Sequence, residues 1–207
     1  MPRTDSAMIG PNAVIQLAAA LKAAGGDRLC AEVFAAAGVS SWLLSPPEGM
    51  IDQAPAARLH RTVRASTSAA DLSGILTQAG RLTADYLLAN RIPPLAQTIL
   101  RQLPDRIAAR ALAAAIRSHA WTFAGSGRFT VRDGSPTVFE IAGNPLCAGE
   151  QAAAPVCAWH AAVFRRLFRA LVSDRTRVTE DACSASGDAV CRFVVDWRPE
   201  RRPHRSL

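Results

Sequence analysis

The hydrophobic pattern of this 207-residue chain changes its period near residue 120, and no other feature constrains the fold as much. Before that point, apolar residues recur at helical spacing. Glycine and proline pairs at Gly25-Gly26 and Pro93-Pro94 separate the stretches, because both residue types interrupt helices. The strongest amphipathic stretch runs from Asp71 to Asn90 and places on one face Leu72, Ile75, Leu76, Leu82, Tyr86 and Leu87. We therefore expect residues 1–118 to be mainly helical.

After residue 118, short segments of β composition replace the helical pattern. Three strands are expected over residues 121–124, 128–132 and 137–141, and a helix over residues 155–172. Two more strands follow over residues 175–179 and 190–197. Because the links are short, the hairpins should be antiparallel. The sequence thus predicts an α+β fold, in which a helical half precedes an antiparallel sheet packed with helices.

Three parts of the chain are expected to form one compact unit. They are the helical part, an α+β domain over residues 119–197, and a basic flexible tail over residues 198–207. The formal net charge is +7, and Lys22 is the only lysine. The arginines are scattered along the expected helices and accompany no recognition motif, so we expect no nucleic-acid partner. An attraction to an anionic membrane surface or to an acidic partner stays open.

The chain has no apolar run of the roughly 18 residues that a membrane span requires. Its first residues also lack the apolar core of a signal peptide. We therefore expect a cytoplasmic protein without a transmembrane segment, with peripheral membrane contact as an open alternative.

Five cysteines occur, an odd number that argues against a disulfide framework. Cys157 lies in the first turn of the expected helix. Cys183 and Cys191 flank the turn of the last hairpin, and Glu180 lies three residues before Cys183. Three thiolates and one carboxylate suit a tetrahedral zinc ion, and four protein ligands would make the site structural. The alternatives are small buried core residues, or His160 as a ligand in place of Glu180.

The segment from about Trp121 to Val195 resembles the 4-vinyl reductase domain, a small-molecule-binding module. The resemblance rests on GSGRFTV, NPLCAG, PVCAWHAAVFRRLF and VTEDACSASGDAVCRFVV, of which the last is the most specific. The whole chain is similar to the members of this family that serve bacteriochlorophyll biosynthesis. The resemblance implies a zinc site formed by Cys157, Glu180, Cys183 and Cys191, and it implies a homodimer.

The resemblance also implies a tetrapyrrole ligand, and three roles toward that ligand are conceivable. Reduction of a vinyl group needs an electron donor, yet the chain has no Gly-x-Gly-x-x-Gly fingerprint and no iron–sulfur spacing of its cysteines. We therefore favour an accessory protein that binds a magnesium porphyrin or divinyl protochlorophyllide and presents it to bacteriochlorophyll biosynthetic enzymes. An 8-vinyl reductase is the alternative. A sensor or regulator is the second, although the chain lacks the Walker motif of complete activators of that kind.

No set of side chains suggests acid–base or nucleophilic catalysis, so no catalytic residue is predicted. A tetrapyrrole needs an apolar slot with aromatic walls and a few polar anchors, and arginine could pair with its propionates. Ordinary core packing is the competing interpretation for each aromatic residue. The candidates for ligand contact are Trp42, His119, Trp121, Trp159, His160 and Phe164.

Overall fold

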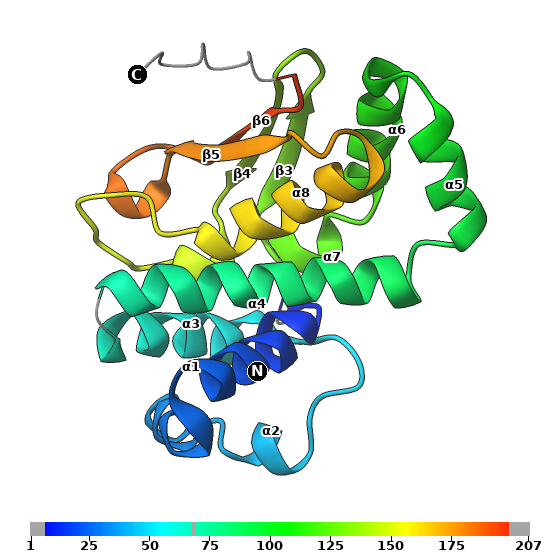
Figure 1. Ribbon diagram of the computed structural model, residues 1–207. Coiled ribbons are helices and arrows are strands. Elements are labelled where there is room, and N and C mark those ends of the chain that lie inside the picture. The colour runs from blue at the N-terminus through cyan, green and yellow to red at the C-terminus, as the bar shows by residue number, and fades with distance from the viewer. Residues whose placement is uncertain (1–6, 68, 199–207) are drawn as a thin grey trace, which may run out of the picture.

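Helices and a four-stranded sheet share one buried core in the computed structural model, which describes residues 7–67 and 69–198. Below the sheet, Figure 1 shows α8, then α4, and then α1 and α3. Helix α4 is central because it packs against both α8 and α1. The predicted α+β class is confirmed. The predicted tail, apart from Arg198, lies outside the described residues.

The first half is helical, as its apolar periodicity predicts. A kink divides the first helix at Gly26, whose φ of 73° lies in the left-handed region that glycine tolerates. The helices of this half are α1 (Asn12–Ala36), α2 (Ser41–Leu44), α3 (Gln53–Ser66), α4 (Ala69–Asn90), α5 (Pro94–Gln102) and α6 (Asp105–Ser118).

Two short strands were not predicted from the sequence. They are β1 (Met8–Ile9) and β2 (Ile51–Asp52), which pair antiparallel. Two residues are too few for a visible alternation of apolar and polar positions. The pair holds the start of the chain beside the first turn of α3, where the Asp52 side chain accepts a hydrogen bond from the Ala54 N–H at 2.8 Å.

The strand predicted over residues 121–124 is wrong, because this segment forms the short helix α7 (Trp121–Ala124). The Ala124 N–H donates to the Ala120 carbonyl at 2.8 Å, so the turn continues the helical path from α6. Gly125, with a φ of 54°, then ends the helix. The β propensity of four residues is small, so the surrounding tertiary structure can override it.

The sheet places its strands in the order β3-β4-β6-β5, and every neighbouring pair is antiparallel. Its strands are β3 (Arg128–Arg132), β4 (Thr137–Ala142), β5 (Arg177–Ala182) and β6 (Cys191–Asp196). Helix α8 (Ala158–Leu171) covers one face. There the Phe164 ring lies 4.9 Å from the Phe139 ring and 5.4 Å from the Phe193 ring, measured between centroids. Such aromatic contacts fix α8 on the sheet.

One corner of the sheet gathers chain segments that lie far apart in the sequence. Ile141 near the end of β4 pairs with Cys191 at the start of β6. Two short 3-10 helices lie at this corner, η1 (Pro145–Cys147) between β4 and α8 and η2 (Ser184–Ser186) between β5 and β6. The N-terminal end of α8 reaches the same place, because Cys157 lies 3.6 Å from Cys191 between their sulfurs.

Candidate metal centre

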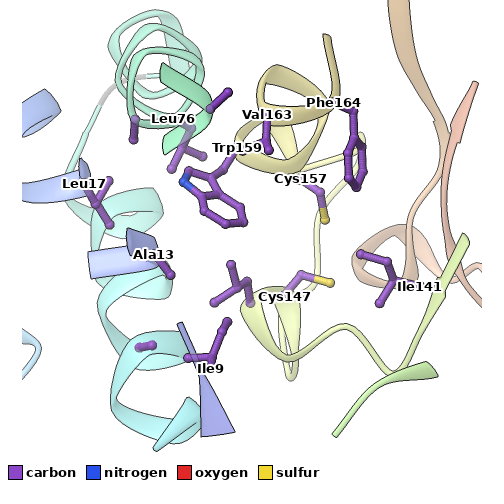
Figure 2. Packing of buried hydrophobic residues seen from close by; sticks show 14 of the residues in the cluster. Ile9, Ala13, Leu17, Leu76, Ile141, Cys147, Cys157, Trp159, Val163 and Phe164 are labelled. Carbon is purple, nitrogen blue, oxygen red and sulfur yellow. The ribbon is translucent and has the colours of Figure 1, made fainter. Parts of the chain in front are cut away.

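Four cysteines meet at this corner, and a different structural element delivers each of them. Cys147 ends η1, Cys157 caps the N-terminus of α8, Cys183 precedes η2 and Cys191 begins β6. All four are at most 3% exposed. Figure 2 shows the sulfurs of Cys147 and Cys157 pointing into the same part of the interior. The four thiols therefore form one buried group.

The spacing of the sulfurs fits a tetrahedral metal ion. The sulfur of Cys191 lies 3.5 Å from that of Cys147, 3.6 Å from that of Cys157 and 3.9 Å from that of Cys183. All four sulfurs lie within 4.8 Å of one another. Zinc–sulfur bonds of about 2.3 Å in a tetrahedron place the sulfurs about 3.8 Å apart. The group therefore has the donor type and the size of a four-thiolate zinc site.

Glu180 lies beside this thiol group and is not one of its members. One carboxylate oxygen of Glu180 accepts a hydrogen bond from the Cys157 N–H at 2.8 Å. The other oxygen is buried and has no hydrogen-bond partner among the described residues. Burial and then the Cys183 thiol raise the pKa of Glu180 to about 8. Of the four predicted ligands, three come together here, and Cys147 completes the group in addition to them.

Hydrogen bonds within the group set its protonation. Neighbouring thiols, Cys147 first among them, lower the pKa of Cys191, because several donors surround one sulfur. The same neighbours raise the pKa of Cys157, and burial adds to the effect. One thiolate is thus favoured at Cys191, whereas four adjacent thiolates would repel one another. A bound cation would remove that repulsion, since it favours the deprotonated form of each ligand.

Buried polar groups surround the thiols and orient them. The Asn144 side-chain amide donates to the sulfurs of Cys157, at 3.3 Å, and Cys191, at 3.5 Å. The Asp188 carboxylate accepts from the Cys183 N–H at 2.8 Å. Outer hydrogen bonds of this kind fix the geometry of metal ligands. They hold the backbone and the sulfurs on both sides of the group in place.

Helix α3, from the first half of the chain, holds the loop that carries Cys147. Arg64 donates to the Leu146 carbonyl at 2.8 Å, and Arg61 donates to the Ala148 carbonyl at 2.7 Å. Arg64 also forms an ion pair with Glu150 at 3.3 Å. Its side chain is only 8% exposed, so this contact is shielded from solvent. The position of Cys147 therefore depends on packing between the two halves.

Cys147 is not among the ligands predicted from the sequence, although it lies in the NPLCAG segment ten residues before Cys157. The spacing of the last hairpin does not include it, because Cys147 lies 44 residues before Cys191. His160, the alternative ligand, is not in the thiol group either. It is buried on α8, its ring nitrogen Nε2 has no partner among the described residues, and burial lowers its pKa to about 4.

The six residues predicted to contact a ligand lie in three different settings. Trp159, His160 and Phe164 are buried on α8. His119 and Trp121 are exposed around α7, where Trp121 is 59% exposed. The sixth, Trp42, lies on α2, at the opposite end of the molecule from the sheet in Figure 1. The structure therefore does not bring these six together in one site, and their role in ligand binding stays a prediction.

Comparison with known proteins places this chain in a family. The vinyl-4-reductase domain, abbreviated V-4-R, matches residues 137–196, which run from β4 to β6. The bacteriochlorophyll synthase 23 kDa chain of Cereibacter sphaeroides is 50% identical over 187 residues, covering 90% of this chain and 89% of that one. The chain of the same description from Rhodobacter capsulatus is 43% identical over 195 residues, with coverages of 94% and 89%.

Among solved structures, a vinyl-4-reductase family protein from Methanocaldococcus jannaschii has a TM-score of 0.37 and 13% identity, covering 67% of this chain and 73% of that one. Among the described residues, no helix has both the length and the apolar character of a membrane span. From the two relatives that are similar over nearly their whole length, we conclude that the chain belongs to the family of the bacteriochlorophyll synthase 23 kDa chains and carries a vinyl-4-reductase domain.

Proposed function

We propose that this protein is a tetrapyrrole-binding accessory protein of bacteriochlorophyll biosynthesis. Its ligand is a magnesium porphyrin or divinyl protochlorophyllide, which it presents for 8-vinyl reduction or a neighbouring step. The observation that carries the proposal is the 50% identity, over 90% of the chain, to a protein named as one chain of a bacteriochlorophyll synthase. That description favours a protein that works beside biosynthetic enzymes.

We further propose that the four cysteines bind one zinc ion and that its role is structural. Support comes from four sulfur–sulfur separations of 3.5–3.9 Å, with all four sulfurs within 4.8 Å of one another, and from the burial of all four thiols. Four thiolates fill a tetrahedral site and leave no position for a substrate or a water molecule. Zinc bound there would crosslink segments of the chain and would take no part in a reaction. It would fasten η1, the N-terminus of α8 and the last hairpin together, and so hold the fold in which a ligand binds.

Absorption spectroscopy of the full-length protein tests the ligand. We expect a shift of the Soret band when micromolar magnesium protoporphyrin IX or divinyl protochlorophyllide is added, and co-elution of pigment with protein. Absence of both effects would end the proposal. The same samples, supplied with electron donors, separate the two activities. Conversion of the divinyl pigment to its monovinyl form would replace the accessory role by a reductase.

A pull-down tests the partners. A protein that presents a pigment should retain bacteriochlorophyll biosynthetic enzymes. A separate measurement of its mass in solution should give a homodimer, as the resemblance to related domains implies. Capture of a transcription factor without biosynthetic enzymes would instead favour a regulatory role.

A further inference from the structure

A groove between α6 and β3 lies outside the six predicted contact residues and offers a place for the ligand. We propose that this groove, the α6–β3 groove, binds the carboxylate-bearing edge of a flat apolar macrocycle. The inference rests on the proposed function, because a tetrapyrrole with propionate groups is the ligand to which it commits. The groove has a volume of about 400 Å³, within the range of small-molecule sites.

The floor of the groove is apolar and carries few bulky side chains. It is formed by Ile107, Ala111 and Ala114 on α6 and by Val131 on β3. The three α6 residues follow one another at intervals of four and three, which places them on one face of the helix. Ile107 is 53% exposed although it is large and apolar. The alanines add little bulk, so a planar ring system could lie close against the helix.

The rim of the groove is positively charged. Arg110 and Arg117 line it from α6, two helical turns or about 10 Å apart along the axis. Both are exposed, and Arg117 has no ion-pair partner among the described residues. Arg110 makes a loose ion pair with Asp133 at 3.7 Å, in which both side chains are more than half exposed. Within the described part of the chain, Asp133 is the single acidic residue that lines the groove.

Charge and shape together select the occupant. Guanidinium groups pair with carboxylates through two parallel hydrogen bonds, so two arginines suit a molecule that bears two carboxylates. The apolar floor between them suits the face of a conjugated ring. A magnesium porphyrin combines both properties. On binding, one propionate would compete with Asp133 for Arg110.

Binding assays with matched variants test the groove. The full-length protein is titrated with magnesium protoporphyrin IX and followed by the Soret band. We expect the double variant Arg110→Glu/Arg117→Glu to bind about tenfold more weakly or worse, because two attractions become repulsions. Arg106→Glu is the control, since Arg106 is exposed on the same helix and does not line the groove. It should leave the affinity unchanged.

Three further binding measurements separate the effect of shape from that of charge. Ala114→Trp fills the floor without changing charge and should weaken binding at least as much as the double variant. Asp133→Asn removes the competing carboxylate and should tighten binding. The dimethyl ester of the porphyrin, which lacks the carboxylates, should bind the wild type more weakly and should not distinguish it from the double variant. Circular dichroism and zinc content check that the surface variants remain folded.

The outcomes distinguish the groove from the function. If the wild type binds the porphyrin, and both the double variant and Ala114→Trp bind it equally well, the α6–β3 groove is not the site while the proposed function stands. Equal binding of the ester and the acid by the wild type would also overturn it, because the carboxylate anchor would be absent. If the wild type binds no porphyrin, the proposed function fails and the groove assignment fails with it.

Discussion

The carboxylate of Glu180 accepts a hydrogen bond from the backbone N–H of Cys157 at 2.8 Å, at the point where α8 begins. The first N–H groups of a helix lack partners within the helix, so this carboxyl oxygen stabilises the N-terminus of α8 as a hydrogen-bond acceptor. The contact also holds the Cys157 backbone against β5. We therefore expect Glu180 to orient the Cys157 thiol, whereas Cys147 contributes the fourth sulfur of the group.

Replacement of each of these two residues tests that assignment. Cys147→Ser should lower the zinc content below one per chain, because it removes a ligand. Glu180→Gln should keep a full zinc complement, with at most about tenfold weaker affinity, because glutamine still offers an oxygen to the Cys157 N–H. Metal analysis after dialysis against a weak chelator gives the zinc content per chain of both variants. Cys30→Ser, a change at a buried cysteine outside the group, should have no effect.

Substitution of cobalt for zinc tests independently which side chains bind the metal. If four sulfurs bind the metal, Cys147→Ser should lose about one quarter of the thiolate-to-cobalt absorption, since one of four thiolates is gone. The spectrum of Glu180→Gln should match that of the wild type. The reverse pattern, with Cys147→Ser intact and Glu180→Gln altered, would make Glu180 the fourth ligand.

The arginines of α3 should differ in their effect on stability. Arg64→Met leaves Glu150 without its shielded partner and frees the Leu146 carbonyl, so we expect a loss of about 2–3 kcal/mol in the free energy of unfolding. Arg61 contacts the same loop but is 50% exposed, so Arg61→Met should cost less than about 1 kcal/mol. Urea denaturation measures both. Equal losses would show that the loop is held in another way.

Two glycines of α4 form a second matched pair. A methyl group on Gly80 would lie 2.3 Å from the Trp159 carbonyl oxygen and 2.7 Å from the Ala162 methyl, so Gly80→Ala should force α4 and α8 apart. We expect a loss of about 1–3 kcal/mol in the free energy of unfolding. Nothing among the described residues lies within 4 Å of the same position on Gly74. Gly74→Ala should therefore stabilise the protein, by about 0.5–1 kcal/mol, through helix propensity.

We expect His60 to make the free energy of unfolding depend on pH. This residue is fully buried, and burial followed by the charge of Arg64 lowers its pKa from 6.5 to about 3. At pH values between about 3 and 6.5, His60 binds a proton in the unfolded chain and does not bind one in the folded chain. The free energy of unfolding should therefore fall as the pH falls, by up to about 1.4 kcal/mol per pH unit.

His60→Gln isolates that contribution. Glutamine does not titrate, yet its amide could still donate to the Ala13 carbonyl, which lies 2.9 Å from Nε2 of His60. Urea denaturation between pH 7 and pH 4 should show a flatter profile for His60→Gln than for the wild type. His119→Gln, an exposed change on the same kind of residue, should reproduce the wild-type profile. An unchanged slope in His60→Gln would contradict the prediction.

Local sequence pattern was sufficient to predict the elements that depend on neighbours along the chain. Apolar residues repeating at helical spacing predict α4, and the short β segments on either side of the turn at Asp133 predict the first hairpin. Cys183 and Cys191 could be paired from the sequence because a hairpin returns the chain upon itself within eight residues. These predictions succeeded because the interactions that stabilise each element are short in range.

Completion of the thiol group depends instead on contacts between distant segments. Cys147 reaches Cys191 because α3 holds its loop through Arg64 and Arg61, contacts that span more than 80 residues. Glu180 meets the unpaired N–H of Cys157 because of the way that α8 packs against β5. The helical form of α7 has the same origin, because it follows from packing at the end of α6 and not from its four residues. Long-range packing leaves no periodic trace in a sequence, so the residue types of a site can be read from the chain while their final partners cannot.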